Sequence, residues 1–185
     1  LHRLIRRQRQ MCIRDSLKVE PTFAEAWRLL GQLNRVTGKT DQAIRALNRY
    51  LELIDDAPDV EVQLAQLYET RGQVDQALAL YDRVIGRSDR FPVAFNNRAY
   101  HRIIAGELDT GLTDAQRAVE LAPYNGEYRD TLGWAYYLRY RRDKDPKDLD
   151  EAFKQLELAV RLVPVRAVIR YHLGKVCLSR GKTDQ

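Results

Sequence analysis

Apolar residues recur along this chain at spacings of three and four positions, which gathers them on one face of an α-helix. Polar and charged residues occupy the positions between them and fall on the opposite face. No segment shows the sustained apolar–polar alternation that is typical of a β-strand. The pattern therefore predicts an all-α fold built from amphipathic helices.

The helical pattern also repeats. Units that begin near residues 24, 58, 92 and 126 lie 34 residues apart, and a fifth unit begins near residue 167. Each unit has a small residue at its eighth position: Gly31, Ala65, Ala99, Gly133 and Gly174. Small side chains at one fixed position allow paired helices to cross closely. Each unit is therefore predicted to be a hairpin of two helices.

Helix-breaking and helix-capping residues mark the ends of these predicted helices. The first helix is expected to end before a glycine at the fifteenth position: Gly38, Gly72, Gly106 and Gly181. The second helix is expected to be N-capped by an aspartate: Asp41, Asp75 and Asp109. Prolines are expected to stop the second helix: Pro21, Pro123 and Pro164.

The fourth unit departs from this regularity through a seven-residue insertion between its two helices, around residues 140–149. Asp145 and Pro146 are typical of an N-cap followed by proline at the first helical position. The first helix of this unit is therefore predicted to run long and to end in a charged tip. A charge-rich tip is either solvated surface or a partner contact, and the sequence leaves both open.

Residues 1–16 are predicted to have a different origin from the repeats, because the DNA that could encode them resembles a sequencing adapter. Met11–Ser16 can be encoded by ATGTGTATAAGAGACAG, which resembles the transposase end of common sequencing-library adapters, and the residues before it fit the upstream adapter bases. We therefore expect residues 1–16 to be non-native and residues 17–185 to be the repeat array, truncated at both ends. The alternative is a natural basic N-terminal arm.

This division changes the interpretation of charge. The whole chain has a formal net charge of +5, but residues 1–16 hold five arginines and one aspartate. Residues 17–185 therefore carry 26 basic and 25 acidic side chains, which removes the argument for nucleic acid as a partner. No apolar run is long enough to span a membrane.

Catalytic chemistry has no positive support in the sequence. It contains no nucleophile motif, phosphate-binding glycine loop or HExxH motif. His101 and His172 have no ligand partner at metal-binding spacing on their own helices, so neither is expected to hold a metal. Cys177 is expected to be a buried, inert thiol. We predict no enzyme activity, no cofactor and no metal site.

Several motifs resemble the tetratricopeptide repeat, whose pattern is Trp-x2-Leu-Gly-x2-Tyr, then Ala-x3-Phe, then Pro. The first unit reads Trp27-x2-Leu30-Gly31, and the second reads Leu64-Ala65-x2-Tyr68. The resemblance covers residues 17–185 and implies an α-solenoid of helical hairpins with a right-handed superhelical twist. Arg98 and Arg102 depart from it, because they replace apolar or aromatic residues in the third unit.

The resemblance also implies a binding groove lined by the first helix of each unit. By register, its candidate peptide-binding residues are Arg28, Gln32, Gln66, Asn96, Tyr100, Asp130, Trp134, Tyr137 and Tyr171. Trp, Tyr and Arg are frequent binding hot spots. The alternative for Trp134 and Tyr137 is packing against the neighbouring unit. These positions do not match the Lys and Asn clamp with which some family members grip a partner's C-terminal carboxylate.

We therefore expect a non-catalytic scaffold that binds a peptide segment of a partner protein in this groove. Two alternatives remain at this point: the array is the regulatory or substrate-recruiting arm of a larger enzyme, or it is a cell-envelope assembly factor.

Overall fold

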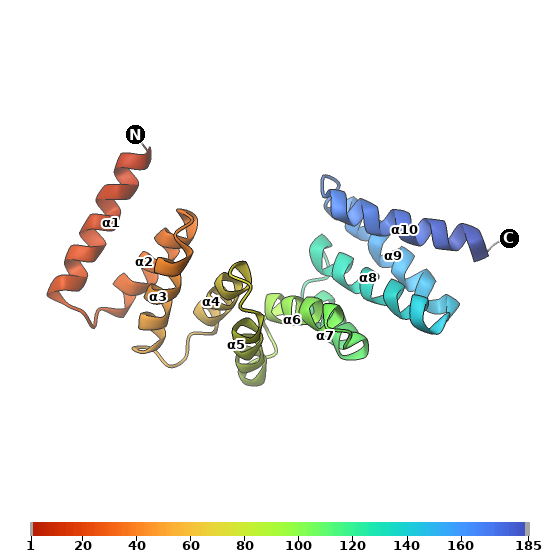
Figure 1. The fold of residues 1–185 in the computed structure, drawn as a ribbon, viewed down its shortest axis with the longest axis horizontal. Helices are drawn as coiled ribbons and strands as arrows, with labels where there is room; N and C mark the ends of the chain where they lie inside the picture. Colours follow the sequence, from red (N-terminus) through yellow and green to blue (C-terminus); the bar gives the residue numbers. More distant parts are fainter. Residues whose placement is uncertain (1, 184–185) are drawn as a thin grey trace. The chain divides into compact units, whose positions relative to one another are not determined.

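The computed structural model describes residues 2–183, with the side chains of residue 8 and residues 10–181. All regular secondary structure in this part of the chain is α-helical, as predicted (Figure 1). The helices are α1 (His2–Val19), α2 (Ala24–Val36), α3 (Thr40–Leu51), α4 (Pro58–Thr70), α5 (Val74–Arg87), α6 (Pro92–Ile104), α7 (Leu108–Leu121), α8 (Gly126–Asp143), α9 (Pro146–Leu162) and α10 (Ala167–Thr183).

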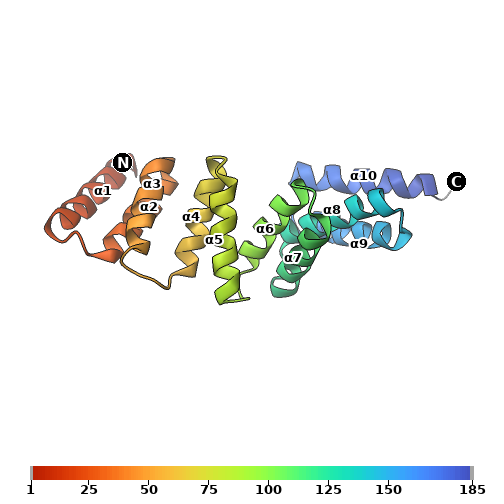
Figure 2. The same ribbon diagram turned by 60° about the horizontal axis from the view of Figure 1, so that its bottom comes forward.

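The chain divides into two compact units. The first comprises residues 1–84 and the second residues 85–185, so that the boundary falls within α5. In the first unit α1, α2, α3 and α4 follow one another, and in the second α6 pairs with α7 and α8 with α9 (Figures 1 and 2). None of the helices described between residues 2 and 183 combines the length and the apolar character that a membrane span requires.

The predicted hairpin turns are confirmed in the first three repeats. Gly38, Gly72 and Gly106 follow α2, α4 and α6 with φ of 71°, 72° and 87°. These left-handed values favour glycine, which has no Cβ to clash with the carbonyl oxygen. The prediction for Gly181 is wrong, because α10 continues through it to Thr183.

Small residues lie where paired helices cross, as the repeat predicted. A Cβ atom added to Gly31 would clash with Leu47 Cδ2, and one added to Gly133 would lie 2.7 Å from Leu156 Cγ. A Cβ on Gly174 would meet nothing within 4 Å. The eighth position is therefore a close-approach site in the first and fourth units, while α10 has no helix against that face within the described residues.

The predicted aspartate N-caps are wrong. Lys39 and Glu107 precede α3 and α7, and neither makes a side-chain capping hydrogen bond. Asp41 and Asp109 instead lie in the first turn of these helices, where a negative charge interacts favourably with the helix dipole. Each also pairs with an arginine of the following repeat, Arg71 and Arg142 respectively, and no sequence pattern predicted these pairs.

A buried ion cluster explains the two arginines that depart from the repeat pattern. Arg98 donates from Nε and Nη2 to Asp114 at 2.8 and 2.7 Å, and Arg102 Nη1 donates to the same carboxylate at 2.8 Å. Asp114 lies on α7 and is buried. The charge of Asp114 is therefore paired twice, which offsets the cost of removing it from water.

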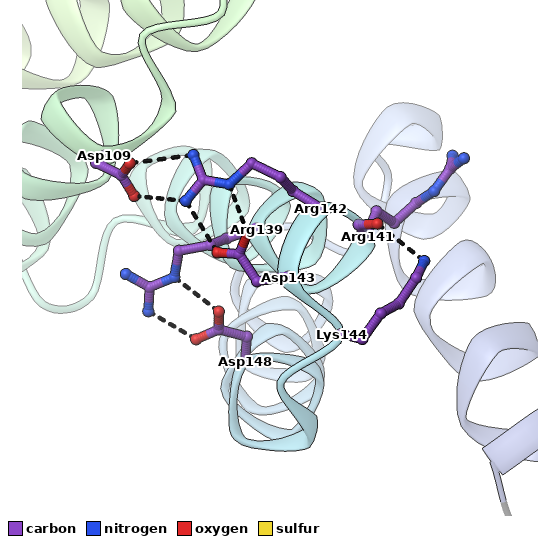
Figure 3. Close-up of polar contacts among 7 residues, drawn as sticks. All are labelled: Asp109, Arg139, Arg141, Arg142, Asp143, Lys144 and Asp148. Atoms are coloured by element: carbon purple, nitrogen blue, oxygen red, sulfur yellow. Dashed lines mark hydrogen bonds and ion pairs between the residues drawn. The ribbon is translucent and has the colours of Figure 1, made fainter.

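The insertion in the fourth unit lengthens α8, as predicted. α8 has 18 residues, against 13 in each of α2, α4 and α6. Asp145 caps α9 by accepting the backbone N–H of Lys147 at 3.0 Å, and Pro146 occupies the first turn. At the tip, Arg139 pairs with Asp148 on α9, while Arg142 bridges Asp143 and Asp109 of α7 (Figure 3).

The N-terminal helix packs on the first complete hairpin. Leu17 is buried beside Leu30, and Ile13 packs against the same cluster. Gln10 Nε2 donates to Asn34 Oδ1 at 2.9 Å. Residue 1 and the side chains of residues 1–7 and 9 lie outside the described part of the chain, and the adapter origin of residues 1–16 stays a prediction.

Candidate functional site

The second compact unit, residues 85–185, contains a pocket of 530 Å³ lined by the first helices of three consecutive repeats. α6, α8 and α10 each place one face on it, which is the arrangement that the repeat register predicts for a groove. The lining residues are Asn96, Tyr100, Ile103, Ile104, Glu127, Asp130, Thr131, Trp134, Leu138, Arg166, Val168, Ile169 and His172. We call this the α6–α8–α10 pocket.

The walls of the α6–α8–α10 pocket are mainly apolar and partly open to solvent. Tyr100, Ile104 and Val168 are 54%, 65% and 51% exposed. Ile103 on α6 and Ile169 on α10, which also line the pocket, are buried in the core. Exposed apolar side chains that gather in a concave pocket, rather than singly over the surface, are typical of a binding site.

A histidine, a tryptophan and an aspartate form a compact polar group in this pocket. The ring of His172 on α10 stacks on Trp134 of α8, with centroids 4.1 Å apart and an interplanar angle of 20°. His172 Nδ1 lies 2.7 Å from Asp130 Oδ1. The side chains of His172 and Asp130 are 15% and 14% exposed. Since Asp130 and Trp134 are one helical turn apart, α8 holds the imidazole on two sides.

The start of α8 supplies a second charged pair. Asn125 caps this helix by accepting the backbone N–H groups of Glu127 and Tyr128 at 2.9 and 3.3 Å. The Glu127 carboxylate forms an ion pair with Arg166, which precedes α10. The hydrogen bond to Glu127 raises the pKa of Arg166, so its guanidinium stays charged. This pair neutralises the most exposed charges on the pocket wall.

One buried polar atom on the wall has no partner. Asn96 Nδ2 donates to Asn97 Oδ1 at 3.2 Å, but Asn96 Oδ1 is buried and accepts no hydrogen bond within the described residues. Buried acceptors are nearly always paired in folded proteins, so an unpaired one on a pocket wall is a feature of interest.

The structure brings together four of the nine predicted groove residues. Asn96, Tyr100, Asp130 and Trp134 all line the α6–α8–α10 pocket. The resemblance to the tetratricopeptide repeat implied groove-facing positions for these four, because such positions recur at fixed places in each first helix, and their role in binding stays a prediction.

Tyr137 and Tyr171 lie elsewhere. Tyr137 is only 5% exposed, and its hydroxyl lies 3.2 Å from Ser179 Oγ on α10. It packs from α8 against α9 and α10, which is the packing alternative that the sequence left open. Tyr171 is exposed, and its ring lies 5.9 Å from His172 and under the ammonium group of Lys175. Neither residue lines the pocket.

The remaining three predicted residues belong to the first compact unit, residues 1–84. Arg28 pairs with Glu25 within α2, where Nε donates to Oε2 at 2.8 Å. This hydrogen bond lowers the pKa of Glu25. Gln32 on the same helix and Gln66 on α4 are half-buried. Two pockets in residues 1–84, one beside Trp27 and one beside Tyr68, are lined by other residues.

The sequence reasoning missed His172, Glu127 and Arg166 as pocket residues. His172 finds its carboxylate partner 42 residues away on another helix, so spacing along its own helix could not reveal it. The signal that was present is positional, because His172 follows the predicted groove residue Tyr171 on the same helix.

Cys177 is exposed, so the prediction of a buried thiol is wrong. The residue faces the side of α10 that has no packed helix within the described part of the chain. In the same part of the chain, no group of three or more His, Cys, Asp or Glu side chains is placed to hold a metal ion.

Two family models match the chain, both described as tetratricopeptide repeat. They cover residues 37–92 and residues 11–58. Comparison with curated proteins gave no match.

Solved structures with the same fold include MamA 41-end from Desulfovibrio magneticus RS-1, at 19% identity and a TM-score of 0.72, covering 85% of each chain. YrrB, a TPR protein with an unusual peptide-binding site, has 17% identity and a TM-score of 0.71, covering 90% of this chain and 81% of its own. PilF from Pseudomonas aeruginosa has 18% identity and a TM-score of 0.69, covering 86% and 69%. At these identities the likeness shows the fold.

Proposed function

We propose that this chain, a tetratricopeptide repeat protein, binds a peptide segment of a partner protein in the α6–α8–α10 pocket without catalysing a reaction. Proteins with this fold are protein-interaction scaffolds. The observation that carries this proposal is the position of the exposed apolar side chains. Tyr100 and Ile104 lie on α6 and Val168 lies on α10, and the three side chains gather on one pocket of 530 Å³.

A peptide is the ligand class that fits this surface best. Covering the exposed parts of Ile104 and Val168 gains free energy through the hydrophobic effect, at about 25 cal/mol per Å². Tyr100 and Trp134 supply the rigid aromatic area that dominates many protein interfaces. The likeness to YrrB, whose structure is described by a peptide-binding site, supports the same ligand class.

Selection from a random linear peptide library tests the proposal. Peptides that bind the immobilised chain are synthesised, and their affinity is measured by fluorescence anisotropy. We expect Ile104→Ser and Val168→Ser each to weaken binding by a factor of about ten, because each removes apolar surface worth about 1–2 kcal/mol. Both side chains are more than half exposed, so the fold tolerates the change.

Matched controls lie on the same unit outside the pocket. Val165 is 89% exposed and precedes α10, and Tyr124 is exposed between α7 and α8. Val165→Ser and Tyr124→Ala should leave the affinity within twofold. If the pocket variants bind as tightly as these controls, or if the library yields no binding peptide, the proposed function is wrong.

A further inference from the structure

The tautomer of His172 follows from its contact with Asp130. Nδ1 lies 2.7 Å from a carboxylate oxygen, and an ionised carboxylate can only accept a hydrogen bond. Nδ1 therefore carries a proton and donates to Asp130. In the neutral imidazole the other ring nitrogen, Nε2, then has a free lone pair and acts as an acceptor.

Nε2 of His172 has no hydrogen-bond partner within the described residues. His172 makes one polar contact there, through Nδ1, together with ring contacts to Trp134 and Tyr171. Among the described side chains, a polar atom that is both buried and without a partner is found at Asn96 Oδ1, and Nε2 of His172 is not such an atom. It is therefore open to solvent, on a residue that lines the pocket.

The ring that carries this acceptor is held in place. Trp134 stacks on its face at 4.1 Å and Asp130 fixes its edge, so neither rotation nor tautomer exchange is free. A polar group whose orientation is set before binding costs less entropy when the ligand arrives. An oriented acceptor in an apolar pocket is also a strong source of specificity, because few groups there can satisfy it.

We propose that His172 Nε2 is the polar recognition atom of the α6–α8–α10 pocket and accepts a hydrogen bond from an N–H group of the bound peptide segment. This inference rests on the proposed function. The N–H belongs to a backbone amide or to an indole that lies beside the apolar side chains filling the pocket. Asn96 Oδ1, which also belongs to a pocket-lining residue, is a second acceptor that a donor of the peptide can satisfy.

Binding of this kind is linked to protonation. A proton on Nε2 turns the acceptor into a donor. The bound segment therefore requires the neutral ring, and affinity should fall as the pH is lowered. Of the ionisable side chains nearby, Asp130 and Tyr171 contact the ring and Lys175 lies over Tyr171. The others that line the pocket are Tyr100, Glu127 and Arg166.

A methylation scan with a variant cycle tests this assignment. A library-selected peptide without Asp, Glu or His, blocked at both ends, is made with each backbone N–H, and any indole N–H, replaced in turn by N-methyl. One position should lose affinity about threefold to tenfold with the native chain, the effect of one neutral hydrogen bond. The same methylation should have no effect on His172→Phe, which keeps an aromatic ring against Trp134.

His101→Phe is the matched control. His101 lies on α6 and does not line the pocket, so this variant should keep the methylation effect. The native chain should also bind the peptide at least about threefold more weakly at pH 5 than at pH 8, whereas His172→Phe should show no such change. The native pH profile needs no variant, so it holds even if His172→Phe fails to fold.

The outcomes separate the two proposals. If peptides bind and Ile104→Ser weakens them, but no methylation distinguishes the native chain from His172→Phe and affinity does not change with pH, the role of His172 is wrong and the peptide site stands. If no peptide binds, or binding ignores the pocket variants, both proposals are wrong.

Discussion

The guanidinium of Arg142 donates to both carboxylate oxygens of Asp109, each at 3.0 Å, although 33 residues separate them in the chain (Figure 3). Arg142 lies at the end of the lengthened α8, and Asp109 lies in the first turn of α7. The same guanidinium also holds Asp143. The insertion therefore fastens the tip of the α8–α9 hairpin to the tip of the α6–α7 hairpin, within the compact unit that carries the pocket.

This contact predicts a specific pH dependence. Hydrogen bonding to Arg142 lowers the pKa of Asp109, so the contact stabilises the fold above the ordinary pKa of an aspartate and is lost as the pH falls through the lowered value. NMR titration should place the Asp109 midpoint below about 3.9, the value of a free aspartate. Arg142→Gln should return it to the ordinary range. An unchanged midpoint in that variant would show that Arg142 is not the cause.

The buried cluster on α6 and α7 predicts a non-additive effect on stability. Asp114→Ala should lower the free energy of unfolding by about 3–5 kcal/mol, because it removes the carboxylate that pairs with the mostly buried Arg98. Other units have leucine at the position of Arg98. Adding Arg98→Leu to Asp114→Ala should therefore recover part of the loss in urea denaturation. A double variant less stable than Asp114→Ala alone would contradict the pairing.

Two glycines at the same repeat position should respond in opposite ways to alanine. Gly133→Ala places a Cβ 2.7 Å from Leu156 Cγ and 3.2 Å from the carbonyl oxygen of Ala152, so it should destabilise by about 1–3 kcal/mol. Gly174→Ala has open space, and it should stabilise α10 by up to about 1 kcal/mol. Thermal denaturation of the two variants measures this, and equal effects would refute the crossing geometry.

Replacing Lys144 with glycine should stabilise the fold. It has φ of 61° at the end of α8, the conformation that Gly38, Gly72 and Gly106 adopt after the other first helices. The left-handed conformation costs a residue with a Cβ about 1–2 kcal/mol. Lys144→Gly should therefore raise the midpoint of thermal unfolding, although it removes the hydrogen bond from Nζ to the carbonyl oxygen of Arg141. A lower midpoint would show that this bond outweighs the backbone cost.

The features that local sequence determines could be predicted. Gly38 marks a turn because its conformation requires glycine, and Asp145 caps α9 because its position before Pro146 does not depend on distant residues. Register along the repeat also located Tyr100 and Trp134 on the pocket wall. Each of these depends on contacts within one hairpin or on one helix face.

The features that escaped prediction depend on contacts between hairpins. The side chain of Tyr137 is buried because α10 packs against it through Ser179, and His172 gains its role because Asp130 reaches it from α8. Asp109 was expected to cap α7, but the end of α8 brings Arg142 to it. A single sequence shows which face a residue occupies, whereas the neighbour on that face depends on how two hairpins pack.

The most direct test of the peptide site is to map where a selected peptide touches the chain. With the isotope-labelled protein, addition of peptide should shift the methyl signals of Ile103, Ile104, Val168 and Ile169 and the indole signal of Trp134. The signals of Val165 and Leu178, which lie outside the pocket, should stay in place. Shifts confined to residues outside the α6–α8–α10 pocket would contradict the account.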